Sequence, residues 1–174
     1  AQQPERVAAA KVLSGPDKQP AGERGPALEK IRRALLAAKV CAYAQGFQLL
    51  RAADREHQWQ LPFATIASVW RAGCIIRADL LEDIRAAFVR SPDLNNLLVE
   101  THFAQVMAKC QQDLREVVAM AALNGVAAPA FMSALAYYDA YRSARLPANL
   151  LQAQRDYFGA HTYQRLDRPG KFHT

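Results

Sequence analysis

The chain has 174 residues, 51% of them hydrophobic and 22% charged, which is enough for one domain with a real hydrophobic core. No apolar run approaches the ~18 residues of a membrane span, so we predict no membrane partner. The chain opens without a signal-peptide pattern. It starts at Ala1 rather than Met, and we expect a piece of a longer or processed protein.

We predict helices throughout, because apolar residues recur at helical spacing and no stretch alternates as a strand would. The expected fold class is all-α. We expect a multi-helix domain over residues 1–163, which contains one long central helix, followed by a basic extended tail over 164–174. In the first half we expect a short helix within 1–13, a long one from Pro26 to Glu56, one that begins at Phe63 and ends at Gly73, and one over Leu80–Phe88 that the Ser91–Pro92 turn closes. In the second half we expect a helix capped by Thr101 and ended by Asn124–Gly125, and another that starts at Pro129. The last expected helix has Asn149 as its N-cap and ends at Gly159.

The long helix carries two rows of apolar residues at steps of three and four. One row is Leu28, Ile31, Leu35, Ala38, Ala42, Leu49 and Ala52; the other is Leu36, Val40, Tyr43, Phe47 and Leu50. Two rows predict burial on two sides, more than a chain of this size covers alone, so we expect self-association. At 1.5 Å per residue the helix is roughly 45 Å long. Gly46 within it predicts close backbone packing, because glycine weakens a helix by about 1 kcal/mol.

The three cysteines, Cys41, Cys74 and Cys110, are widely spaced and form no CxxC pair. This pattern is typical of reduced, buried thiols rather than of a metal site or a disulfide framework. We therefore predict no metal and a cytoplasmic location.

Positive charge is concentrated near the end of a chain whose net charge is +6. From residue 142 onward there are two acidic residues and six basic ones, namely Arg142, Arg145, Arg155, Arg165, Arg168 and Lys171. A local charge beside His161 suits a small phosphorylated ligand at least as well as a duplex. We predict no nucleic-acid partner, because the basic residues share no recognition helix. A helical nucleic-acid-binding protein stays as an alternative that salt-dependent binding to random DNA would reveal.

Several long, non-repetitive strings resemble the C-terminal all-helical domain of decarboxylating 6-phosphogluconate dehydrogenase. They occur in the right order and cover nearly the whole chain. The strings are KVCAYAQGFQLL (Lys39–Leu50), VWRAGCIIR (Val69–Arg77), YYDAYRSARLPANL (Tyr137–Leu150), LPANLLQAQRDYFGAHTY (Leu146–Tyr163) and PGKFHT (Pro169–Thr174).

The resemblance implies an oxidoreductase of the pentose phosphate pathway and of gluconate utilization. Such an enzyme oxidises 6-phosphogluconate with NADP and releases carbon dioxide to give ribulose 5-phosphate, working as a homodimer. In that family the dinucleotide-binding domain, the general-base lysine, the acid glutamate and another substrate-binding arginine all lie upstream of the part matched here. This chain has no GxGxxG loop, so we expect no cofactor-binding or catalytic residue in it and no activity from it alone.

Arg155 and His161 are the candidate substrate-binding residues. By themselves they have an ordinary structural interpretation, since an arginine in the last turn of a helix complements its dipole and a histidine after the helix often only caps it. The resemblance implies more, because the arginine and histidine of the family's RDYFGAH string bind the phosphate end of the substrate from the neighbouring subunit. A guanidinium fork and an imidazole are suited to phosphate oxygens.

The other candidate residues favour structural roles. We expect Lys39 to extend to solvent, and Arg71 and Arg77 to form ion pairs with Glu82 or Asp79 rather than an anion site. His57 and His102 have no metal-ligand pattern around them, and the tyrosines at 137, 138 and 141 favour packing. A stand-alone, non-catalytic helical dimerisation module derived from the family remains the alternative. A GxGxxG-containing domain encoded directly before Ala1 would decide for the enzyme.

Overall fold

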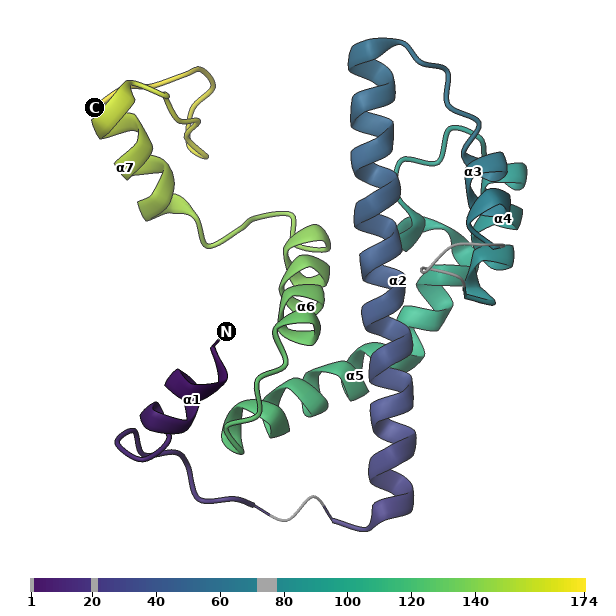
Figure 1. Cartoon of the computed structure of the whole chain (residues 1–174). Coiled ribbons are helices and arrows are strands. Elements are labelled where there is room, and N and C mark those ends of the chain that lie inside the picture. The colour runs from purple at the N-terminus through teal and green to yellow at the C-terminus, as the bar shows by residue number, and fades with distance from the viewer. Residues whose placement is uncertain (1, 20–21, 72–77) are drawn as a thin grey trace. The chain divides into compact units, whose positions relative to one another are not determined.

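The computed structural model describes residues 2–19, 22–71 and 78–174, and within these ranges it is all-α, as the sequence predicts (Figure 1). The only strand-like pairing in the described ranges is one antiparallel bridge between Tyr163 and Phe172. The elements are α1 (Gln3–Ala9), α2 (Arg24–His57), α3 (Phe63–Trp70), α4 (Leu80–Arg90), a 3₁₀ turn η1 (Leu97–Val99), α5 (Thr101–Leu123), α6 (Pro129–Tyr141) and α7 (Asn149–Gly159).

The chain divides into two compact units, residues 1–137 and 138–174, and the boundary falls inside α6. The expected division at residue 163, with a separate tail beyond it, remains a proposal. The first unit contains the long helix and most of the apolar core. The second contains α7 and the basic residues that follow it, and therefore both candidate ligands.

The core of the first unit forms where α2 packs against α5 and η1, while α3 packs against α4. Val40 from α2 and Phe103 from α5 are completely buried, as are Leu81 and Ile84 from α4. Burying a side chain of this size contributes about 1.5–3 kcal/mol, so this cluster supplies most of the unit's apolar stabilisation.

An aromatic cluster joins α2 to the α3–α4 pair. The Phe47 ring lies 4.9 Å from the Phe88 ring and 5.1 Å from the Trp70 ring, measured between centroids. Phe63 stacks on Phe88 at 5.3 Å, and the Arg51 guanidinium covers Phe63 at 4.5 Å. These tilted and stacked contacts add to the area that the rings bury.

Three helix starts differ from the prediction. Helix α2 begins at Arg24, two residues before Pro26. The cap of α5 is Glu100 rather than Thr101, because the Glu100 carboxylate accepts the N–H groups of His102 and Phe103. Asn149 is the first residue of α7 and makes no capping bond. Acidic and amide side chains next to a helix start compete for the same role, which is why sequence alone misplaced the cap by one residue.

In the single chain, α2 is buried along one apolar row and open along most of the other, in agreement with two rows that a chain of this size does not cover alone. Val40 and Phe47 of one row are buried, and of the other row Ala38 is buried but Leu49 is 71% exposed. The exposed members of that second row, called the exposed row of α2, are Leu28, Ile31, Leu35, Ala42, Leu49 and Ala52. The expected close packing at Gly46 is absent from the single chain, since a Cβ added there would meet no described atom within 4 Å outside its own stretch of helix.

Cys41 and Cys110 are buried free thiols, as expected, whereas Cys74 lies outside the described residues. Burial raises the pKa of the Cys41 thiol to about 11, which keeps it protonated and unreactive. Among the described residues, no helix combines the length and the apolar character that crossing a membrane requires.

Candidate functional site

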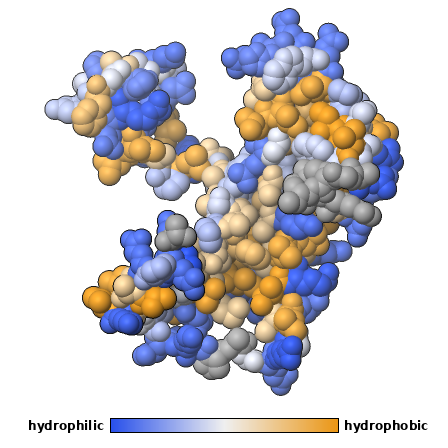
Figure 2. Space-filling view, in the orientation of Figure 1, coloured by the Kyte–Doolittle hydropathy of each residue, from blue (hydrophilic) through white to orange (hydrophobic). Residues whose placement is uncertain are grey.

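Helix α7 presents Arg155 to solvent, next to two exposed aromatic residues. The Arg155 Nη1 donates to the Gln152 Oε1 at 3.1 Å, one turn earlier on the same helix. Tyr157 and Phe158 are 80% and 81% exposed, and hydrophobic residues accordingly reach the surface of this segment in Figure 2. Arg155 lies just before the last turn of α7, not within it as predicted, so compensation of the helix dipole does not account for its position.

His161 follows α7 inside a turn of unusual backbone geometry. Ala160 and Thr162, on either side of it, both have left-handed backbones, with φ of 50° and 58°. The prediction that α7 stops at Gly159 is confirmed, but the left-handed residue is Ala160 rather than the glycine. The His161 side chain is exposed and lies against Gly159, whose Cβ, if present, would be 3.1 Å from both the Cδ2 and the Nε2 of the ring.

Asp156 organises the segment from beneath, and it is the one completely buried side chain among residues 138–174. Its carboxylate accepts the Thr162 N–H at 2.7 Å, the Thr174 N–H at 2.9 Å and a contact from His173 Nδ1 at 3.0 Å. Burial by itself would raise the pKa of the Asp156 carboxyl. The bonds from Thr174, His173 and Thr162 outweigh that effect and hold the pKa below its ordinary value, so the carboxylate is ionised near neutral pH.

The tail has no helix, as predicted, but it folds back onto α7. Tyr163 and Phe172 exchange two backbone hydrogen bonds of 2.9 Å, and this brings His173 and Thr174 to Asp156. Gln152 adds a bond from its Nε2 to the Thr162 carbonyl at 2.6 Å. The sequence analysis missed Gln152, Asp156 and His173. The sequence does contain a signal for Asp156: a carboxylate in the last turn of a helix interacts unfavourably with the helix dipole, so another interaction must stabilise it.

Some of the remaining candidates make the structural contacts expected of them. Arg71 forms an ion pair with Glu82, while its proposed companion Arg77 lies outside the described residues. Lys39 is half-buried. His57 stacks on Trp59 with centroids 4.8 Å apart. The part of the chain that the structure describes contains no group of three or more His, Cys, Asp or Glu placed to hold a metal ion.

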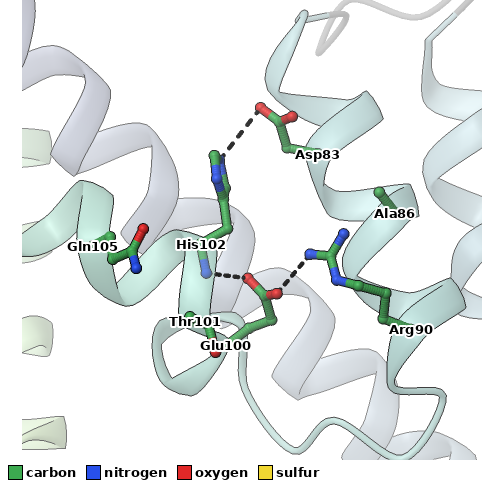
Figure 3. A pocket seen from close by; sticks show the side chains of 7 residues that line it. All are labelled: Asp83, Ala86, Arg90, Glu100, Thr101, His102 and Gln105. Atoms are coloured by element: carbon green, nitrogen blue, oxygen red, sulfur yellow. Dashed lines mark hydrogen bonds and ion pairs between the residues drawn. The ribbon is translucent and has the colours of Figure 1, made fainter.

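A surface cavity of about 320 Å³ between α4 and α5 is an alternative site (Figure 3). His102 Nε2 lies 3.7 Å from Asp83 Oδ2, and the Arg90 Nη2 donates to Glu100 Oε1 at 2.6 Å. Its charged groups are therefore matched with one another, and Glu100 also caps α5. This arrangement ties two helices together and leaves little charge for a ligand, in contrast to Arg155, whose partner is a neutral amide.

The fold and the site define the class of protein: an all-helical domain whose C-terminal segment presents an arginine and a histidine to solvent. The chain belongs to the 6-phosphogluconate dehydrogenase family: the model of that enzyme's C-terminal domain matches residues 1–174.

Relatives agree with this placement. The chain is 56% identical over 170 residues to the decarboxylating 6-phosphogluconate dehydrogenase of Escherichia coli K12, and 53% identical over 169 residues to that of Lactococcus lactis subsp. lactis. The alignments cover 98% and 97% of this chain but 36% of each relative, so the chain spans little more than a third of their length.

A solved structure shares the fold. It is the 6-phosphogluconate dehydrogenase of Plasmodium falciparum, described in its apo form and in complexes with NADP⁺ and with 6-phosphogluconate. The TM-score is 0.88 at 36% identity, covering 99% of this chain and 37% of that one. The expected fold and family are thus confirmed.

Proposed function

We propose that this chain is the later helical part of an NADP-dependent enzyme that oxidises and decarboxylates 6-phosphogluconate to ribulose 5-phosphate in the pentose phosphate pathway, acting in the cytoplasm as a homodimer. Its own contribution is a dimerisation surface and two ligands for the substrate phosphate, Arg155 and His161. NADP is held by a part of the enzyme other than this chain, whose sequence has no glycine-rich dinucleotide loop.

The observation that carries the proposal is the state of the two ligands. Arg155 and His161 are both exposed, and within the described residues neither forms a hydrogen bond or an ion pair with an acidic residue. Many of the other arginines pair with Glu or Asp, among them Arg71, Arg85 and Arg90. A cation left unneutralised on an ordered segment is suited to an anion that comes from outside.

The chemistry of phosphate binding explains the choice of residue types. The Arg155 guanidinium stays charged at every physiological pH and offers parallel N–H donors that match two phosphate oxygens. His161 adds a donor whose charge varies between about pH 5 and 8. Binding, not proton transfer, is the role proposed for both, because the general base and acid of the family lie outside this chain.

Dimerisation is supported by apolar surface that the single chain leaves open. The exposed row of α2 includes Ile31, Leu35 and Leu49, and Leu150 and Phe158 are exposed on α7. A monomer rarely keeps so many large apolar side chains in contact with water. A second copy that covers them would also place the ligand segment of one subunit near the other.

Kinetics of the complete enzyme test the proposal. Losing a charge-assisted contact typically costs about 1.5–3 kcal/mol, roughly ten- to a hundredfold in binding. We expect Arg155→Ala to raise the KM for 6-phosphogluconate by that factor and to leave the KM for NADP unchanged, with Arg155→Lys recovering only part. His161→Ala should matter less at high pH, where the imidazole is already neutral. An unchanged KM for 6-phosphogluconate in both alanine variants would refute the assignment.

The chain alone supplies the complementary test. We expect the purified 174-residue protein to reduce no NADP in the presence of 6-phosphogluconate. Detectable reduction would show that catalytic groups are present in this chain after all.

A further inference from the structure

We propose that Gly159, Asp156 and Gln152 are positioning residues for His161: together they fix the direction in which the imidazole is presented to the substrate. The inference rests on the proposed function and goes further, because it names the groups that make an exposed histidine a directed ligand. None of the three needs to touch the substrate.

Two side chains of α7 hold the residue that follows His161. The Asp156 carboxylate accepts the Thr162 N–H at 2.7 Å, and the Gln152 Nε2 donates to the Thr162 carbonyl at 2.6 Å. Both polar groups of one peptide residue are thereby attached to positions 152 and 156, which lie one turn apart on the same helix face. Left-handed backbone conformations cost free energy for residues with a Cβ, such as Ala160 and Thr162. The two hydrogen bonds of Thr162 offset this cost and stabilise the turn.

Gly159 supplies the space in which the imidazole lies. A Cβ at this position would be 3.1 Å from the Cδ2 and Nε2 atoms of His161, closer than ordinary van der Waals contact. Helix α7 already ends at Gly159, and the left-handed residue there is Ala160, so a positive φ is not the reason for glycine at this site. The remaining reason for a glycine is space: the His161 ring occupies the volume that a side chain at position 159 would need.

The tail closes the same clamp. His173 Nδ1 and the Thr174 N–H both reach the Asp156 carboxylate, so the buried acceptor joins the end of the chain to the turn that carries His161. Gln152 extends the arrangement to the second ligand, because its Oε1 accepts from Arg155 while its Nε2 holds Thr162. Gln152 therefore contacts Arg155 as well as the turn that carries His161, whereas the Asp156 carboxylate bonds to that turn and to the tail.

Gly159→Ala in the complete enzyme separates positioning from mere stability. Alanine is the better helix residue, so the melting temperature should stay the same or rise. The added methyl group displaces the His161 ring, and a displaced imidazole makes a weaker contact with the substrate phosphate. We expect the KM for 6-phosphogluconate to rise about tenfold, with kcat and the KM for NADP unchanged.

Asp156→Asn is the second variant, and Asp167→Asn is its matched control. Asp167 is an exposed tail carboxylate paired with Arg165, so the same chemical change there should leave the KM for 6-phosphogluconate within about twofold. Asp156→Asn keeps the shape of the side chain but loses acceptor capacity and charge. We expect it to raise the same KM about tenfold.

Double-mutant cycles with His161→Ala decide the question. If both substitutions act through the imidazole, neither Gly159→Ala nor Asp156→Asn should raise the KM by more than about twofold once His161 is absent. Equal effects with and without His161, or an unchanged KM in Gly159→Ala, would overturn the inference. If Arg155→Ala and His161→Ala themselves leave the KM unchanged, the proposed function fails first, and the inference fails with it.

Discussion

The two units of the chain are stabilised in opposite ways. Residues 1–137 bury a cluster of apolar side chains, among them Phe103, Leu81 and Met107, and pair their surface charges with one another. Residues 138–174 bury one side chain completely, the carboxylate of Asp156, and expose Leu150, Leu151, Tyr157 and Phe158. The first unit is ordered mainly by hydrophobic burial, and the second by hydrogen bonds, several of which meet at Asp156.

This difference separates the two units by what orders them, not by what they expose. The first unit has its own apolar core yet leaves the exposed row of α2 open, and the second, the α7 segment, leaves Leu150, Tyr157 and Phe158 in contact with solvent. We propose that a partner covers such residues in both units. The polar clamp at Asp156 keeps this segment ordered without using those residues. They therefore remain available for a partner while Arg155 and His161 keep their positions.

The largest difference between the units should come from removing one phenylalanine in each. Phe103→Ala leaves a cavity in the first unit and should lower the free energy of unfolding by about 3–5 kcal/mol. Phe158→Ala removes an exposed ring and should change it by less than about 0.5 kcal/mol. Chemical denaturation of the 174-residue chain, at a protein concentration low enough to keep it monomeric, measures both. Similar losses for the two variants would show that Phe158 is buried in solution.

A charge on the exposed row of α2 should disrupt association and leave the fold intact. Leu35→Asp places a carboxylate where the proposed partner packs, and we expect the dimer dissociation constant to rise at least about tenfold. Lys11→Asp, at an exposed position in the turn that follows α1 and outside that row, is the control. Sedimentation at micromolar concentration gives the constants. A dimer that tolerates the aspartate would exclude this row from the interface.

Gly46→Ala sharpens the same question with a smaller effect. No described atom lies within 4 Å of the added Cβ, so the isolated chain should gain about 1 kcal/mol of helix stability. If a second copy approaches the α2 backbone at Gly46, the substitution will weaken the dimer while stabilising the monomer. Thermal unfolding at low and high protein concentration distinguishes these results, and a destabilised monomer would contradict the single-chain geometry.

The smallest effect concerns the titration of Asp156. Its pKa is held below the ordinary value, so its bonds stabilise the segment fully above about pH 3.9, and this contribution is lost as the pH falls through the lower folded pKa. His173→Ala removes one of the groups that lower the pKa, and the titration midpoint should move upward. Carboxyl chemical shifts report it. A midpoint that does not respond to His173 would show that the tail does not reach Asp156 in solution.

Most of the fold follows from the sequence, because helical spacing and breakers such as Asn124–Gly125 mark nearly every element. The caps were harder, since Glu100 and Thr101 are adjacent and both able to cap α5. The exposed row of α2 shows the limit of such a pattern: it identifies the apolar residues, but it does not say whether the same chain or another one covers them.

The candidate site was predicted only in part. Resemblance led to Arg155 and His161, whose types suit phosphate. The residues that position these two were missed, because their role depends on the return of the tail to α7. Asp156 contacts His173 and Thr174, which are 17 and 18 residues further along the chain, and no local sequence pattern encodes such contacts. Gly159 was identified as the helix end, but the nearby His161 ring gives it a second reason to be glycine.

The central claim is that Arg155 and His161 serve the active site of the neighbouring subunit. Mixing two variants of the complete enzyme, each defective at low 6-phosphogluconate concentration, tests it. One chain carries Arg155→Ala, and the other lacks the general-base lysine that the family places upstream. In the mixed dimer, the subunit with a working base receives the intact segment of its partner, so one complete site forms. We predict that activity at low 6-phosphogluconate concentration returns in proportion to the heterodimers formed. Heterodimers without recovered activity would show that Arg155 acts within its own chain, or does not act on the substrate.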